Sequence, residues 1–279
     1  MIALVDTHCH LVLLEERGLL QQALEGAAEA GVEQVVSIGL DVEDSERNRR
    51  IAESRPGVLF SVGWHPHQPA SPDGPQLAAL RELLTHPRAV AVGEVGLDAY
   101  WRPGYHETPM EVQLRSLRMM LELAAESAKP VVVHDRDAHE EVMAEISRWV
   151  GSDDGRGGLR RPRGVLHCFS GTTDLARRAA SLGMVCSFAG TVTFPGSAPI
   201  REAARAVADD GYVLETDAPF LAPVPHRGRP NLPGYVAATA AAVAELRGQP
   251  LERVAAATTA NARRLFALPD PSGDRLGGG

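Results

Sequence analysis

Positive charge and aromatic rings are both scarce in this 279-residue sequence. It contains a single lysine, Lys129, and carries a formal net charge of −8, whereas a protein that coats duplex DNA is usually basic. Aromatic residues make up 5% of the chain, so no stacking surface of a single-strand-binding module is apparent. Any nucleic-acid substrate would therefore have to be held locally, by bound metal ions and a few arginines.

Cysteines and long apolar runs are scarce as well. The three cysteines, Cys9, Cys168 and Cys186, are odd in number and form no C-x-x-C pair, which argues against a disulfide framework or a zinc ribbon. No apolar run is long enough to cross a membrane, and the N-terminus has no basic segment followed by a cleavage site. We therefore expect a cytoplasmic protein with no signal peptide and no membrane contact.

Short apolar runs alternate with helical patterns along the chain. The expected strands are 2–5, 34–38, 58–62, 89–92, 130–133, 164–166, 184–188 and 212–214. Helical patterns cover 16–30, 42–54, 76–85, 109–128, 138–150, 174–182, 199–208, 235–247 and 251–266. Eight strands, each followed by a helix, predict an α/β fold of the (β/α)8 TIM-barrel type with an extra C-terminal helix.

The main alternative fold is a doubly wound parallel sheet. No G-x-G-x-x-G follows the first expected strand, which argues against the dinucleotide-binding version of that sheet. Because no linker divides the sequence, residues 1–268 are expected to form one barrel domain, and the Gly- and Pro-rich residues 269–279 a flexible tail. The segment 151–164 is expected to be a mobile surface loop.

Side chains that can bind metal ions stand where the expected strands end. In a barrel of parallel strands these ends converge on one face, where active sites lie. His8 and His10 are two apart on extended backbone, so both can face the mouth of the barrel. The full set at strand ends is His8, His10, His65, His67, Glu94, His134, His167 and Asp217.

The donor types in this set predict a metal site. Imidazole nitrogens and carboxylate oxygens suit zinc, manganese, cobalt or magnesium better than a metal that requires thiolates. Four imidazoles and two carboxylates exceed one tetrahedral shell, so two ions sharing a bridging carboxylate, with a water activated between them, are the expected arrangement. The predicted ligands are His8, His10, Glu94, His134, His167 and Asp217.

Each of these residues is a weak signal by itself. A lone His-x-His pair is often a surface feature, and Asp217 before Pro219 is also what a turn requires. The set is informative because all its members stand at strand ends. The remaining histidines lie away from strand ends and are interpreted as surface residues or residues behind the ligands: His86, His106, His139 and His226.

Seven motifs, in order along the chain, resemble the TatD family of metal-dependent deoxyribonucleases. They are 6–10 (DTHCH), 63–67 (GWHPH), 93–98 (GEVGLD), 130–134 (PVVVH), 167–171 (HCFSG), 215–219 (ETDAP) and 261–266 (NARRLF). Their order and spacing fit the family from residue 2 to 268. The resemblance implies a TIM barrel of the amidohydrolase-like superfamily, and magnesium- or zinc-dependent trimming of DNA, often 3′ to 5′, and sometimes of RNA.

The resemblance also implies roles for single residues. One ion would be held by His8, His10 and Asp217, the second by His134 and His167, with Glu94 as the bridge. His65 would lie close to the scissile phosphate or help hold an extra ion, and Glu215 is a weaker choice for that auxiliary role.

The predicted reaction is hydrolysis of a phosphodiester bond, preferably in single-stranded DNA, by a water that two divalent ions (Mg²⁺, Mn²⁺ or Zn²⁺) activate. Asp217 is the predicted base, and Glu94 and His65 complete the predicted catalytic set. Arg136 and Arg229 are predicted phosphate contacts, and Arg102 is a weaker third.

Two alternatives remain open from the sequence. A related barrel hydrolase could act on amide, ester or aminoacyl-ester substrates, although many such enzymes bridge their ions with a carbamylated lysine. The sole lysine, Lys129, begins the fifth expected strand, at the opposite end of the barrel. The non-enzymatic alternative is a metal-stabilised nucleic-acid-binding protein.

Overall fold

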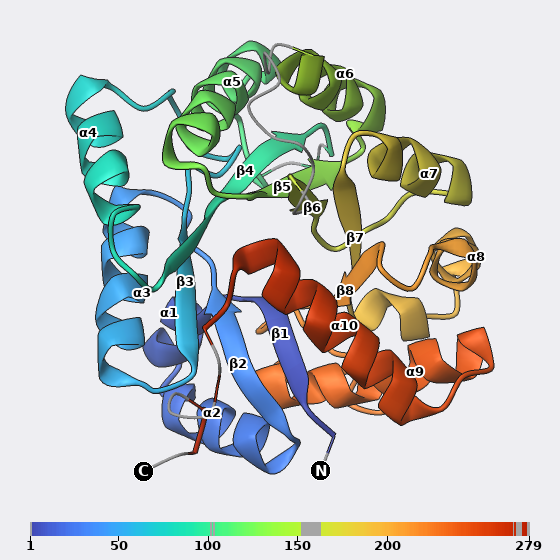
Figure 1. Ribbon diagram of the computed structural model, residues 1–279. Helices are drawn as coiled ribbons and strands as arrows, with labels where there is room; N and C mark the ends of the chain where they lie inside the picture. Colours follow the sequence, from blue (N-terminus) through green and yellow to red (C-terminus); the bar gives the residue numbers. More distant parts are fainter. Residues whose placement is uncertain are drawn as a thin grey trace.

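The computed structural model describes residues 2–100, 102, 104–151, 163–269, 271 and 275–277. Eight parallel strands, ordered β1 to β8, curl into a nearly closed barrel with helices on its outside (Figure 1). The strands are β1 (Leu4–Cys9), β2 (Val32–Ser37), β3 (Val58–Val62), β4 (Ala89–Asp98), β5 (Val131–Arg136), β6 (Gly164–Leu166), β7 (Met184–Phe188) and β8 (Tyr212–Leu214). The helices are α1 (Leu11–Glu16), α2 (Leu20–Glu29), α3 (Val42–Ser54), α4 (Gly74–Leu83), α5 (Met110–Ser127), α6 (His139–Gly151), α7 (Thr173–Ser181), α8 (Ala198–Ala206), α9 (Val236–Arg247) and α10 (Leu251–Phe266), with short 3-10 turns η1 (Gly190–Thr193) and η2 (Pro233–Tyr235).

The interior of the barrel is filled by one layer of apolar side chains to which every strand contributes. Helix α10 adds Leu265 and Phe266 to the same cluster, and it lies across β1 and β8 (Figure 1). The strand residues of this layer are Val5, Val36, Leu59, Val90, Val132, Val165, Val185 and Val213. The predicted TIM barrel with an extra C-terminal helix is therefore confirmed, and the barrel is a packed core and not a pore.

The seam of the barrel is closed by the ends of β1 and β8. The Asp217 backbone N–H donates to the His8 carbonyl at 2.9 Å, and the His10 N–H donates to the Ala218 carbonyl at 2.7 Å. Because backbone hydrogen bonds fix this register, the side chains of His8, His10 and Asp217 are brought to the same point of the rim.

The helix expected over 16–30 is observed as α2, which starts only at Leu20, and it is preceded by a short helix that was not expected, α1. Helix α1 ends at Glu16 and α2 starts at Leu20, and between them Gly18 has a φ of 70°. Glycine adopts this left-handed conformation without the strain that a Cβ would cause, so the chain turns there and α1 stops. The periodicity alone does not reveal this break, because apolar residues continue on both sides of it.

Strand β4 is much longer than the run expected over 89–92. It extends to Asp98, and Gly96, Leu97 and Asp98 pair with β5 at His134 and beyond. A Cβ at Gly96 would overlap the His134 carbonyl oxygen, so glycine permits the close approach of the two strands. Glu94 consequently lies inside the strand and not at its end.

Most of the expected surface loop over 151–164 lies outside the described residues. Of the expected tail over 269–279, the structure describes 269, 271 and 275–277. There, the Leu276 N–H donates to the Glu33 carbonyl at 3.0 Å and the Leu276 side chain packs into the core. Among the described residues, no helix has the length and apolar character needed to cross a membrane.

Candidate metal centre

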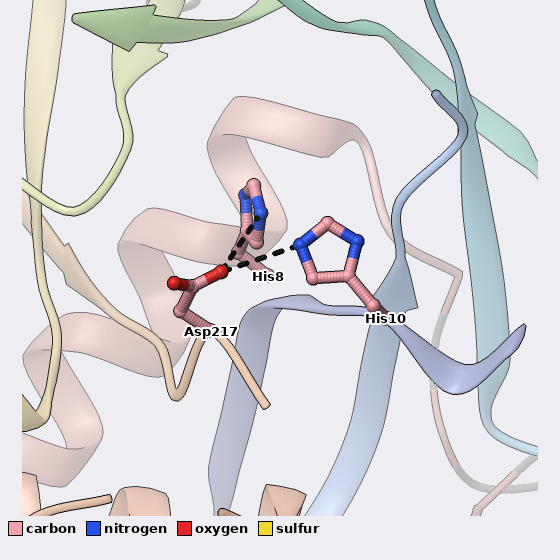
Figure 2. Close-up of side chains that lie close together, drawn as sticks. All are labelled: His8, His10 and Asp217. Atoms are coloured by element: carbon pink, nitrogen blue, oxygen red, sulfur yellow. Dashed lines mark ion pairs between the residues drawn. The ribbon is translucent and has the colours of Figure 1, made fainter. Parts of the chain in front are cut away.

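Three of the predicted ligands meet at the seam between β1 and β8. His8 is on β1, His10 follows it, and Asp217 follows β8 (Figure 2). Asp217 Oδ1 lies 3.3 Å from His10 Nε2 and 3.6 Å from His8 Nε2. Two imidazoles converging on one carboxylate oxygen form a donor set that suits a divalent cation.

Glu94 lies at the middle of the cluster, and its two carboxylate oxygens face different partners. Oε2 lies 3.5 Å from His8 Nε2 and 3.9 Å from His10 Nε2. Oε1 lies 2.7 Å from His134 Nδ1 and 2.8 Å from His167 Nε2. One oxygen therefore faces the β1 histidines and the other faces the histidines of β5 and β6, which is the placement that a bridging carboxylate needs. We call the six residues His8, His10, Glu94, His134, His167 and Asp217 the Glu94 centre.

The electrostatics of the Glu94 centre keep its carboxylates ionised. Burial alone would raise the pKa of Glu94, but the surrounding imidazoles, His167 and His65 foremost, hold that pKa well below its usual value. Burial by itself would lower the pKa of His167, but the Glu94 and Glu215 carboxylates raise it well above the usual value. Burial and the neighbouring His167 lower the pKa of His8. The metal-free centre thus balances its negative charge with protons, which a cation would replace.

Several imidazole nitrogens in the centre have no hydrogen-bond partner among the described residues. They are both ring nitrogens of His8, Nδ1 of His10 and Nδ1 of His167; of these, His8 Nε2 and His167 Nδ1 face carboxylate oxygens of Glu94 and Glu215 at 3.5 and 3.6 Å. Buried polar atoms are nearly always satisfied, so each unsatisfied one needs an explanation such as an ion. The donor types, the burial and these nitrogens all fit the divalent cations expected from the sequence.

Two buried acids, Asp6 and Glu215, contact the residues and segments that carry the proposed ligands. Asp6 accepts hydrogen bonds from the Thr216 hydroxyl at 2.6 Å and the Thr216 N–H at 2.9 Å, which ties β1 to the segment that carries Asp217. Glu215, the weaker auxiliary choice, lies 3.6 Å from His167 Nδ1 through Oε1 and accepts from the Cys168 N–H. Such partners fix the orientation of metal-ligating side chains.

Sequence reasoning missed Asp98, which the structure buries next to the centre. Asp98 Oδ2 accepts from His134 Nε2 at 3.2 Å, so His134 Nδ1 is left to face Glu94. Hydrogen bonds from His134 and His67 outweigh burial and lower the Asp98 pKa. Strand periodicity carries the signal that could have found it, because Asp98 is four residues beyond Glu94 on one extended strand and shares its face.

The predicted substrate contacts are placed differently from one another. His65 follows β3, and its Nε2 lies 3.5 Å from Glu94 Oε1, at the edge of the centre. The Arg136 guanidinium ends β5, donates to the Tyr105 hydroxyl at 2.5 Å and lies 4.0 Å from the Tyr100 ring centroid. The Arg102 guanidinium carbon lies 4.9 Å from the Tyr105 ring centroid. Arg229 is exposed after β8, and within the described part of the chain no hydrogen bond or ion pair joins its guanidinium to the centre.

A TIM barrel that gathers imidazoles and carboxylates at the carboxyl ends of its strands is the architecture of a metal-dependent hydrolase. The family model described as TatD related DNase matches residues 5–267, nearly the whole chain. The chain therefore belongs to the TatD family.

Individual relatives agree with this assignment. YabD of Bacillus subtilis (strain 168), described as an uncharacterised metal-dependent hydrolase, is 34% identical over 265 residues that cover 95% of this chain and 99% of that protein. The 3′-5′ ssDNA/RNA exonuclease TatD of Erwinia billingiae (strain Eb661) is 34% identical over 254 residues, covering 89% and 93%. The crystal structure of YjjV, a TatD homologue from Escherichia coli K12, is similar with a TM-score of 0.85 at 30% identity, covering 96% of this chain and 100% of that one.

Proposed function

We propose that this protein is a deoxyribonuclease that removes nucleotides from the 3′ end of single-stranded DNA, with RNA as a second substrate. The observation that carries the proposal is the division of the Glu94 carboxylate between two sets of imidazoles, 2.7 Å from His134 on one side and 3.5 Å from His8 on the other. The relative named as a 3′-5′ ssDNA/RNA exonuclease supports the polarity and the substrate. A cytoplasmic location, which the cysteine count predicts, belongs to the same proposal.

The proposed division of the ligands is the one that the family resemblance implies, and for its first group the ligand atoms of His8, His10 and Asp217 lie within 4.8 Å of one another. His8, His10 and Asp217 would hold one divalent ion, His134 and His167 the other, and Glu94 both. When bound, two such ions supply an acidified water and neutralise charge on a phosphodiester.

Two side chains have proposed roles in the chemistry itself. Asp217 is ionised, because the hydrogen bond from His10 and the charges of His8 and His10 outweigh burial and lower its pKa, so its carboxylate can accept the proton of the attacking water. His65 is neutral at pH 7, since burial lowers its pKa to about 4. Its Nδ1 accepts from the His67 backbone N–H, so the ring proton is on Nε2, which faces Glu94 Oε1 at 3.5 Å; a phosphate oxygen bound beside Glu94 would share this donor.

Arg136 is the better supported of the two proposed arginine contacts. Tyr100 and Tyr105 hold its guanidinium at the carboxyl end of β5, on the side of the barrel where Asp98 lies. A guanidinium held in this way is pre-organised for a bidentate phosphate contact. A phosphate contact of Arg229 is proposed only from the position of this residue in the loop after β8.

The position of Lys129 weighs against the amide- and ester-hydrolase alternative. Its ammonium donates to the carbonyl of Ala89, the first residue of β4, at 2.5 Å. The side chain is therefore bound at the amino ends of the strands, far along β4 from Glu94. It is not placed to become a carbamylated bridge between two ions.

A substrate panel tests the proposal directly. Oligonucleotides of single-stranded DNA, duplex DNA and RNA, together with an aminoacyl ester and a cyclic amide, are incubated with Mg²⁺, Mn²⁺, Zn²⁺ or EDTA. We expect single-stranded DNA labelled at its 5′ end to shorten stepwise with Mg²⁺ or Mn²⁺ and to stay intact in EDTA. Stable oligonucleotide binding in EDTA, without cleavage when metal is restored, would instead favour the non-enzymatic alternative.

The role of Asp217 is tested in the same assay. Asp217→Asn should abolish cleavage while the circular dichroism spectrum and thermal melt stay close to wild type. Asp209→Asn is the matched control, because Asp209 is a partly exposed carboxylate that pairs with Arg247 and Arg253 away from the centre. Activity of Asp217→Asn at the level of Asp209→Asn would rule out Asp217 as the base.

A further inference from the structure

A second group of metal-binding side chains lies beside the Glu94 centre. His67 follows β3, Asp98 ends β4, and His106 lies in the segment between β4 and α5. His67 Nε2 is 2.8 Å from Asp98 Oδ2, and His106 Nε2 is 3.9 Å from Asp98 Oδ1. One ligand atom from each residue lies within 4.8 Å of the other two. The Glu94 centre does not use His67 or His106.

His106 is the unexplained member of this group. Its side chain is 10% exposed, and neither ring nitrogen makes a hydrogen bond of standard geometry with a described residue, although the Tyr100 backbone is close enough to raise its pKa slightly against the effect of burial. Its ring stacks on His67 with centroids 4.3 Å apart and an interplanar angle of 16°, so it is aimed at the same space as His67. A buried imidazole with both nitrogens unsatisfied is costly unless something binds there.

We propose that His67, Asp98 and His106 form an additional binding site for a divalent cation of the zinc type, separate from the Glu94 centre. Two imidazoles and one carboxylate are donors that Zn²⁺ accepts, and three protein ligands leave a coordination position open. His67 is 26% exposed, so solvent reaches the site from the mouth of the barrel. We call this group the outer site.

The outer site is connected to the Glu94 centre through one carboxylate. Asp98 Oδ2 also accepts from His134 Nε2 at 3.2 Å, so the residue that would ligate the outer ion also orients a proposed ligand of the inner pair. Among the described residues, the ion pairs of His67 and His106 are with Asp98 and not with Glu94, so either imidazole can be replaced without removing an ion pair of Glu94. This makes His106 the position at which the outer site can be removed by itself.

Metal content measures the outer site without reference to catalysis. The protein is stripped with chelator, equilibrated with buffered Zn²⁺, and its bound zinc counted by mass spectrometry. His106→Asn should bind one equivalent less than wild type. The control His86→Asn should match wild type, because His86 pairs with Glu53 and precedes β4, at the other end of the barrel. The double variant Glu94→Gln/His106→Asn should likewise bind one equivalent less than Glu94→Gln alone. That result would show that the zinc lost with His106 is not an ion of the Glu94 centre.

Anomalous diffraction at the zinc edge locates the ion in wild-type crystals and does not depend on how any variant folds. We expect a peak between the three side chains, in addition to any peak at Glu94. Absence of that peak in zinc-soaked crystals, or equal zinc content in His106→Asn and wild type, overturns the outer site. Either result leaves the proposed nuclease activity untouched, because that activity is tested by the substrate panel.

Discussion

Replacing Glu94 with glutamine tests whether this carboxylate bridges two metal ions. The change removes one buried negative charge but keeps the size of the side chain and one of its oxygens. Glu94 has close imidazole neighbours on both sides, at 2.8 Å for His167 Nε2 and 3.5 Å for His8 Nε2. Any cation held by these imidazoles therefore lies within a few ångströms of the carboxylate.

The size of the effect follows from electrostatics. Two unit charges about 4 Å apart attract each other by about 4 kcal/mol at an effective dielectric constant of 20. A bridged ion carries two charges, so this value is a lower bound; since about 1.36 kcal/mol corresponds to a tenfold change, losing the Glu94 charge should weaken the binding of each bridged ion by roughly a thousandfold or more. The free energy of unfolding of the metal-free protein should change much less, because the imidazoles can lose their protons.

The assay is a competition between the protein and a chromophoric chelator for Mn²⁺ or Zn²⁺, with a thermal melt to verify folding. Glu145→Gln is the matched control, since Glu145 is also a buried glutamate but pairs with Arg118 on the outside of the barrel. The control should bind metal as wild type does. If Glu94→Gln binds two ions with wild-type affinity, Glu94 is not the bridge and the assignment of the centre fails.

Two further predictions follow from the same structure. His134 and His167 have raised pKa values, so their protons stabilise the metal-free protein below pH 6.5 and this stabilisation is lost as the pH rises through the folded values. A metal ion must displace these protons, so metal affinity should rise with pH. Calorimetric titration with metal at pH 7, in buffers of different ionisation enthalpy, should detect the released protons. The same heat of binding in every buffer would contradict this. A Cβ at Gly63 would overlap the Glu94 amide nitrogen, so Gly63→Ala should destabilise the fold by about 1–3 kcal/mol. In helix α2, Gly26→Ala meets nothing and should stabilise by about 0.5–1 kcal/mol; equal thermal melts for the two variants would refute the argument.

The grouping of the proposed ligands was predictable because parallel strands bring their carboxyl ends to one face. The prediction required only the recognition that each apolar run is followed by a polar residue at the carboxyl end of the strand. After three valines, β5 presents His134, and His167 follows directly after β6. The structure brings these two imidazoles within 3.2 Å of each other, although they are far apart in the sequence. Their roles as ligands remain predictions.

The features that sequence reasoning missed depend on tertiary contacts. Gly93 and Gly96 interrupt the apolar run of β4, so the pattern appears to stop at Val92, whereas pairing with β5 extends the strand to Asp98. His106 stands in a segment without periodicity, and only the folded chain stacks its ring on His67. No local pattern predicts such a contact, because neither helix nor strand geometry fixes the spacing between the two residues.

The acidity of the chain is consistent with a nucleic-acid substrate only when the centre contains metal. Glu94 and Asp217 are both held ionised, and the raised pKa values of His10, His134 and His167 let protons balance these two negative charges, so the metal-free centre offers little net attraction to an incoming phosphate. Two divalent ions would bring four positive charges against the two carboxylates and leave the centre with a net positive charge. With a net charge of −8 and a single lysine, the rest of the surface cannot supply that attraction by itself. Chelation should therefore remove oligonucleotide binding together with cleavage, which is the result that separates a metal-dependent nuclease from a protein that binds nucleic acid through its own side chains.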